Sequence, residues 1–185
     1  TMVGDQGGPF SYPGDYFSAE APEKYKIKGS FGHPVPVVDG KTQSSGAKAS
    51  AIVLKKEFTD VKDLLCIDYT SAYSTPSLDK LVRTFVYDRQ GKGSFTVGDE
   101  FTANAPIRFE TAITTQANWK IIDDTHHLLT TGTEQMTVTI EASGKVAFTS
   151  ETIEVNSPAY TRIGISLKEQ SKDGYIRLTM RTKQL

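Results

Sequence analysis

Hydrophobic and polar residues alternate with a period of two along much of the chain. Residues 136–140, 163–167 and 176–180 follow this pattern closely, and residues 107–113 follow it as well. Successive side chains of a strand point to opposite faces, so each segment would have one apolar and one polar face. No stretch of about a dozen residues carries a helical stripe. The pattern predicts an all-β fold, an antiparallel two-layer β-sandwich in which residues 1–185 form a single domain.

The alternation also predicts which side chains form the core and where the chain turns. On two of these strands the expected inward residues are Ile163, Ile165, Leu167, Ile176, Leu178 and Met180. Glycine accepts a positive φ without steric cost, which makes certain dipeptides strong turn signals. We expect turns at Asp39-Gly40, Gln90-Gly91, Ser143-Gly144 and Asp173-Gly174.

Charge and cysteine content exclude some classes of protein. The chain has 185 residues and a formal net charge of −1 at pH 7. It therefore has no overall field that would attract nucleic acid or an anionic membrane. No apolar run is long enough to span a bilayer. The single cysteine, Cys66, excludes an internal disulfide, and the apolar run around it favours a small buried hydrophobic residue over a reactive thiol.

One stretch stands apart from the strand pattern. Residues 29–43 read Gly-Ser-Phe-Gly-His-Pro-Val-Pro-Val-Val-Asp-Gly-Lys-Thr-Gln and place one histidine at the start of a short apolar run. Pro34 and Pro36 keep that run extended and remove two backbone donors, so it is poorly suited to a helix or to the middle of a sheet. The sequence thus predicts that His33 is held at a defined place, at the entry of an extended segment.

The same stretch resembles a known family. Gly-His-Pro-Val-Pro-Val-Val-Asp-Gly-Lys-x-Gln is similar to the signature of heparinase II/III-like polysaccharide lyases, near the start of their C-terminal β-sandwich domain. Gly4-Asp5-Gln6-Gly7-Gly8 resembles the acidic, glycine-rich motif that precedes it, and weaker similarities extend over nearly the whole chain. The family often has His-Asn where this chain has His33-Pro34, which puts in doubt a substrate contact from position 34.

The resemblance implies a function for the protein from which the chain comes. Such proteins cleave uronic-acid-containing polysaccharides, including glycosaminoglycans, by β-elimination, and most of their catalytic residues lie on a helical toroid. We therefore expect these residues to be an inactive fragment that packs on an N-terminal helical toroid domain, in a periplasmic or secreted protein acting on acidic polysaccharide. Two alternatives stay open: a carbohydrate-binding sandwich without lyase activity, and a structural sandwich that braces the toroid.

The resemblance also implies a metal site. In the family an acidic residue and two histidines hold a metal beside the sandwich. Asp5 matches the acidic position and His33 matches the later histidine, whereas the other histidine lies upstream. Both are residue types that bind zinc. We expect zinc or another divalent metal in the full-length protein, with the side chains of Asp5 and His33 converging. Judged from the residues alone, His33 is equally well interpreted as a hydrogen-bonded structural histidine.

Aromatic residues and a histidine pair complete the candidates. Tyr12 and Tyr16 follow the acidic motif as aromatic residues of the family do, so the resemblance implies that they face the substrate. The alternative is that they form core beneath a long loop. His126 and His127 are adjacent, so on a strand they would point to opposite faces and could not share one site. The neighbouring Asp123-Asp124 favours a surface loop.

Overall fold

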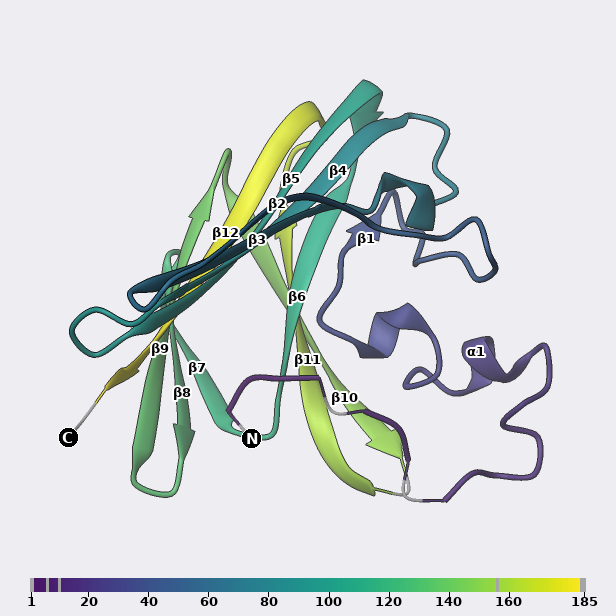
Figure 1. Cartoon of the computed structure of the whole chain (residues 1–185). Coiled ribbons are helices and arrows are strands. Elements are labelled where there is room, and N and C mark those ends of the chain that lie inside the picture. Colours follow the sequence, from purple (N-terminus) through teal and green to yellow (C-terminus); the bar gives the residue numbers. More distant parts are fainter. Residues whose placement is uncertain (1, 6, 10, 156, 184–185) are drawn as a thin grey trace.

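The chain folds into two unequal antiparallel sheets packed face to face (Figure 1). The computed structural model describes residues 2–5, 7–9, 11–155 and 157–183. Both layers are β-sheet, so the predicted all-β sandwich is confirmed.

The larger sheet has eight strands, which are, from edge to edge, β2 (Ile52–Phe58), β3 (Lys62–Asp68), β4 (Leu78–Asp88), β5 (Ser94–Ile107), β12 (Ser171–Lys183), β9 (Glu134–Ala142), β8 (His126–Thr131) and β7 (Asn118–Asp123). The smaller sheet has four, which are β1 (Val37–Val38), β6 (Phe109–Thr115), β11 (Ser157–Leu167) and β10 (Val146–Val155). The helical elements of the described residues are short: α1 (Ala21–Lys24), η1 (Ser30–Gly32) and η2 (Thr70–Ala72).

The core lies between the two sheets, where the alternation predicted it. In the smaller sheet, Ile163 of β11 lies opposite Ile113 of β6, and Ile165 lies opposite Phe148 of β10. All six predicted inward residues are buried, from Ile163 to Met180. Their alternate neighbours face outward, because the pleat of a strand fixes side-chain direction residue by residue.

The chain crosses from one sheet to the other at Arg108. Ile107 ends β5 and pairs with Ser171 of the larger sheet, whereas Phe109 begins β6 and pairs with Val38 of the smaller one. Figure 1 shows β5 continuing directly into β6. The segment that looked like one strand in the sequence is therefore the junction of two strands.

The N-terminal segment forms a further layer on the outer face of the smaller sheet. Tyr16 and Ile27 from this segment pack with Ile153 of β10 and Tyr160 of β11 in a small second core. Figure 1 shows α1 and the loops around it lying on that side of the sandwich. This layer brings the residues of the family-like motifs against the sheet.

Most of the expected turns are confirmed. Asp39 and Gly40 both have positive φ, 54° and 76°, and reverse the chain between Val38 and Lys41. Residues 90–91 and 143–144 also lie between strands. The turn expected at Asp173-Gly174 is wrong, because both residues lie inside β12, next to an irregularity in its pairing with β5.

Cys66 is only partly buried, on a strand near the sheet edge, and accepts a hydrogen bond from the Thr84 hydroxyl at 3.5 Å. Among the described residues there is no helix long and apolar enough to cross a membrane.

Candidate functional site

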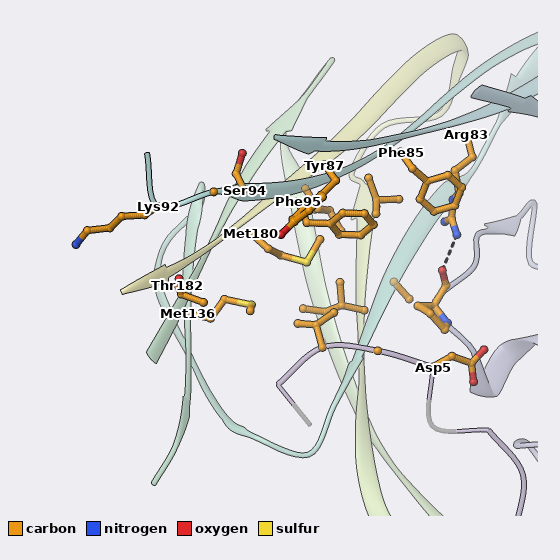
Figure 2. Close-up of a pocket in the computed structure, with 18 residues that line it drawn as sticks. Asp5, Arg83, Phe85, Tyr87, Lys92, Ser94, Phe95, Met136, Met180 and Thr182 are labelled. Atoms are coloured by element: carbon orange, nitrogen blue, oxygen red, sulfur yellow. Dashed lines mark hydrogen bonds between the residues drawn. The ribbon is translucent and has the colours of Figure 1, made fainter. Parts of the chain in front are cut away.

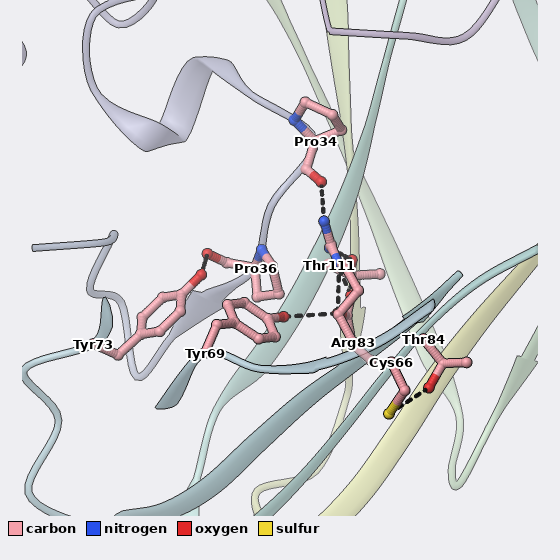
Figure 3. Close-up of polar contacts among 9 residues, drawn as sticks. Pro34, Pro36, Cys66, Tyr69, Tyr73, Arg83, Thr84 and Thr111 are labelled. Atoms are coloured by element: carbon pink, nitrogen blue, oxygen red, sulfur yellow. Dashed lines mark hydrogen bonds and ion pairs between the residues drawn. The ribbon is translucent and has the colours of Figure 1, made fainter. Parts of the chain in front are cut away.

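The extended segment Gly32–Pro36 is held by buried side chains that donate to its carbonyl groups. The Tyr160 hydroxyl donates to the Gly32 carbonyl at 2.7 Å, Arg83 Nη1 to the Pro34 carbonyl at 2.7 Å, and the Tyr73 hydroxyl to the Pro36 carbonyl at 2.8 Å. Figure 3 shows the last two of these contacts. Every second carbonyl of the segment is thus anchored to the sandwich, which fixes the position of His33.

The anchor at Pro34 belongs to a buried ionic network inside the sandwich. Arg83 of β4 donates from Nε and Nη2 to the two carboxylate oxygens of Asp99 on β5, at 2.7 and 2.8 Å. The hydroxyls of Thr111 and Tyr69 also donate to Asp99, at 2.6 and 2.7 Å. Buried charges are tolerated when they are paired and their remaining hydrogen-bonding groups are satisfied.

The electrostatics of the network keep Arg83 charged. Burial opposes the charge on Arg83, but Asp99 more than offsets it, so the pKa of the guanidinium stays above its ordinary value. Burial raises the pKa of Tyr69 and Tyr73, with Asp99 adding to the effect. Both hydroxyls are therefore protonated donors at neutral pH.

Asp5 and His33 converge, as the sequence predicted. His33 Nδ1 lies 2.9 and 2.8 Å from the two carboxylate oxygens of Asp5. Its other nitrogen, Nε2, lies 2.9 Å from the carbonyl oxygen of Ile27. Gly7, with φ of 68°, bends the first loop and donates its N–H to Asp5 Oδ1 at 2.8 Å. Gln6, within the same motif, lies outside the described residues.

The arrangement does not by itself fit a metal ion. Both imidazole nitrogens are in contact with protein oxygen atoms, so neither is free to coordinate an ion in this arrangement. In the described part of the chain, no group of three or more His, Cys, Asp or Glu side chains is placed to hold an ion. A protein zinc site uses about four ligands. A metal would need further ligands and a rearranged His33, so metal binding stays a prediction.

Gly32 is required by a close backbone approach. A Cβ at this position would lie 2.4 Å from the carbonyl oxygen of Lys26 and 2.8 Å from the Cα of Ile27. The Gly32 N–H donates to that same Lys26 carbonyl at 3.0 Å. The glycine therefore lets residues 26–27 and 32–33 touch, and this contact brings the Ile27 carbonyl to His33.

Of the two expected substrate-binding tyrosines, one is exposed and one is buried. The Tyr12 side chain is 60% exposed, whereas Tyr16 is 7% exposed. The Tyr16 ring packs against Tyr12, Phe17 and Tyr25 at centroid distances of 5.0, 5.4 and 5.5 Å. Tyr16 thus supports an exposed aromatic surface made by Tyr12 and Phe17. The role of either tyrosine in substrate binding remains a prediction.

The expectation for the histidine pair was wrong in one respect. His126 and His127 begin β8 and do point to opposite faces, but they do not lie in a surface loop. His127 is fully buried, with its ring edge-on to Phe148 of the other sheet at 4.4 Å. Neither of its ring nitrogens has a hydrogen-bond partner among the described residues. Burial lowers the pKa of this imidazole.

Sequence reasoning did not assign Arg83 and Asp99 any role. A signal was present, because Asp99 occupies an inward position of β5, between Val97 and Phe101 on the apolar face. Arg83 lies directly opposite Asp99 on the neighbouring strand. A charged residue at an inward position predicts a buried partner, but the partner could be identified only after the strand register was known.

A pocket of about 600 Å³ opens between the larger sheet and the N-terminal segment (Figure 2). Met136, Met180 and Phe95 line it from the sheet, and Asp5 lies at its rim. The lining is mostly apolar, which does not suit a polar glycan chain. The pocket adjoins the His33 site, because Asp5, Pro34 and Arg83 belong to the lining of both.

Comparison with solved structures identifies the fold. Neither a protein-family model nor a curated protein matches the sequence. The heparan sulfate lyase HepC from Pedobacter heparinus has 14% identity and a TM-score of 0.77, and the match covers 100% of this chain and 29% of that one. A heparinase III with methylated lysines has 14% identity and a TM-score of 0.72, with 100% and 28% covered.

A further heparinase III crystal structure has 15% identity and a TM-score of 0.67, with 88% of this chain and 25% of that one covered. The chain thus spans little more than a quarter of the length of these solved chains. Identity at this level establishes the fold alone. The chain has the fold of one domain of the heparinase III structures, as its sequence motifs had indicated.

Proposed function

We propose that the chain is the C-terminal β-sandwich domain of a polysaccharide lyase that cleaves uronic-acid-containing polysaccharides by β-elimination. The observation that supports this best is the fold likeness to heparinase III structures along the full length of the chain. The anchored Gly32–Pro36 segment adds to it, because the motif that suggested the family is held to the sandwich by three hydrogen bonds from buried side chains.

In β-elimination a base removes the proton at C5 of the uronate, and an acid protonates the leaving glycosidic oxygen. No residue of this chain is assigned either task. Both ring nitrogens of His33 are engaged, so we propose that it holds the loop in place and does not transfer protons. The catalytic residues would come from a helical toroid domain on which the sandwich packs, in a periplasmic or secreted protein.

Exposed aromatic rings support a contact with the polysaccharide. The Tyr12 and Phe17 rings are exposed and lie 5.1 Å apart between centroids. Lys28 lies over the Phe17 ring at 5.6 Å. Aromatic faces beside a cation suit the rings and acidic groups of a uronate polymer. We propose that this surface, with Tyr16 beneath it, borders the substrate path.

The proposal is tested by comparing this chain with a longer polypeptide that includes the preceding region. Each is incubated with heparin, heparan sulfate, alginate and hyaluronan, and the unsaturated uronate product is followed by its absorbance. We expect activity on at least one polymer only for the longer polypeptide. Turnover by the 185 residues alone would contradict the proposal that the catalytic residues come from another domain. An inactive longer polypeptide that still binds glycan would favour a carbohydrate-binding module.

A further inference from the structure

A hollow lies on the outer face of the larger sheet, away from the His33 site. It has a volume of about 280 Å³ and surrounds Gly98 in the middle of β5. Thr84 of β4 and Arg177 of β12 lie directly opposite Gly98 on the two neighbouring strands. The hollow exists because Gly98, the central one of these three cross-strand neighbours, has no side chain.

Packing does not demand a glycine at position 98. The three atoms nearest to a Cβ built there all belong to the Arg177 side chain, and the closest lies at 3.6 Å, an ordinary van der Waals distance. The φ of Gly98 is not positive. Glycine inside a strand weakens it, because it contributes backbone entropy and no side-chain packing. The residue therefore costs stability and leaves a depression in the outer face of the larger sheet.

An exposed aromatic ring separates this hollow from a second one. Tyr175, which is 38% exposed, lines the Gly98 hollow and also a hollow of about 530 Å³ beside the β9–β10 turn. Arg177 lies over the Tyr175 ring at 5.7 Å and donates from Nη1 to Glu141 at 3.0 Å. Two hollows on either side of an aromatic ring suit a chain of sugar units, with one ring stacked between them.

Carboxylates outnumber cations around the two hollows, and the Arg177 cation is paired with Glu141, which disfavours an acidic polymer. The side chains that line this surface include the carboxylates of Glu100, Glu141 and Asp124, against the cations of Arg177 and Lys145. Asp99 also borders the first hollow, but its carboxylate faces the opposite side of the sheet, toward Arg83. Carboxylates and hydroxyls such as those of Thr84 and Thr96 accept hydrogen bonds from sugar hydroxyls.

We propose that this face is a second saccharide-binding site, which takes neutral hexose units of a polysaccharide. The Gly98 hollow holds one unit, Tyr175 stacks on the next, and the second hollow continues the path. Because its charges disfavour uronate, the site is separate in place and in ligand from the proposed lyase substrate path. It does not depend on whether the protein is a lyase.

The test is to titrate this chain with the neutral probes cellohexaose, maltohexaose and N-acetylchitohexaose. Binding is measured by NMR and by calorimetry. We expect saturable binding of at least one probe, with resonance shifts at Gly98 and Tyr175. Tyr175→Ala should weaken binding at least about tenfold. Gly98→Val should abolish binding while leaving the unfolding midpoint unchanged or higher, since the added side chain fills the hollow and suits a strand.

Tyr87→Ala is the matched control. Tyr87 is also exposed and also carries an arginine over its ring, Arg89 at 4.9 Å, but it lies beside the other pocket. Its replacement should leave binding unchanged. Three outcomes would overturn the proposal: no saturable binding of any neutral probe, equal loss in the Tyr87 variant, or tighter binding of an alginate hexasaccharide at the same residues.

Discussion

At Gly32 two backbone segments touch, and this contact sets the geometry of the candidate site. The change of Gly32 to alanine would force a Cβ to within 2.4 Å of the Lys26 carbonyl oxygen. The segment would have to move, which would loosen the contacts of His33 with Asp5 and Ile27.

For Gly32→Ala we expect a loss of about 1–3 kcal/mol in the free energy of unfolding, as for other overpacked sites. Urea denaturation measures this loss, and the ring resonances of His33 should shift in the same variant. Gly144→Ala is the control, because a Cβ there has nothing within 4 Å. Equal stability of both variants would show that the close approach at Gly32 is unimportant.

His127 makes stability depend on pH. Burial lowers the pKa of this imidazole in the folded state below its unfolded value of about 6.5. The neutral form is favoured on folding, so its contribution is fully present above pH 6.5 or so. As the pH falls below that value, the unfolded chain binds a proton that the folded chain excludes, and stability falls.

The expected slope from His127 is at most about 1.4 kcal/mol per pH unit below the unfolded pKa. Unfolding free energies of the protein and of His127→Leu, measured between pH 7.5 and 5, isolate this term as their difference. The nearby Asp123 carboxylate acts in the opposite direction, but weakly. If the free energy of unfolding of His127→Leu changed with pH in parallel with that of the unaltered protein, His127 would not be the source of the pH dependence.

At the scale of elements, the Gly32–Pro36 segment depends on strands that lie far from it in sequence. β4 and β5 supply the Arg83–Asp99 pair, and β11 supplies Tyr160. Toward these strands the segment contributes its carbonyl groups, and its two prolines have no N–H to donate. Its conformation is therefore imposed by the sandwich, and the ionic pair can be changed to test this.

Asp99→Ala should cost about 3–5 kcal/mol, because it leaves the Arg83 charge buried without a partner. The double variant Arg83→Met, Asp99→Leu should recover much of this loss, since apolar residues of similar volume often replace a buried pair well. It should nevertheless free the Pro34 carbonyl. We expect a free energy of unfolding close to that of the unaltered protein, but faster hydrogen exchange at the Val35 amide. A double variant as unstable as Asp99→Ala would argue that the pair is needed for folding itself.

At the scale of the molecule, the two sheets differ in size and part of the larger one is uncovered. Tyr87 and Phe95 lie on its inner face around the apolar pocket, and they are 46% and 39% exposed. An exposed apolar surface of this kind is a common site of contact with another domain. This agrees with the proposal that the sandwich packs on a further domain.

The metal prediction also belongs to the whole molecule. Asp5 and His33 offer two side chains, so the 185 residues alone should bind zinc weakly. A longer polypeptide that includes the preceding region should bind zinc more tightly in calorimetry, because it can supply further ligands. His33→Ala should remove that gain. Zinc binding by the longer polypeptide that is indifferent to His33→Ala would refute the metal role.

Much of the fold could be predicted because strand alternation is a local property. The direction of each side chain follows from the pleat, so Ile163, Ile165 and Leu178 were identified as core from spacing alone. The Asp39-Gly40 turn followed from the conformational freedom of its residues. The Asp173-Gly174 prediction failed because pairing with Thr102 and Phe101 of β5 keeps that dipeptide within the strand.

The candidate site could be predicted only in part. The motifs singled out Asp5 and His33, and the prolines predicted an extended segment. The contacts that hold the segment were not visible, because they join residues far apart in sequence, such as Gly32 and Tyr160. His127 was misplaced for the same reason, since its burial depends on Phe148 of the opposite sheet.

By itself, the sequence determined the all-β class, the inward and outward faces of the strands, and the presentation of one histidine at a proline-bounded segment. Only the tertiary structure decided the unequal sheets, the pairing of Arg83 with Asp99, and the occupation of both His33 nitrogens. Side-chain direction and turn preference arise within a few residues of chain. Strand order and register depend on which distant segments bury the most surface together, and local sequence does not encode that choice.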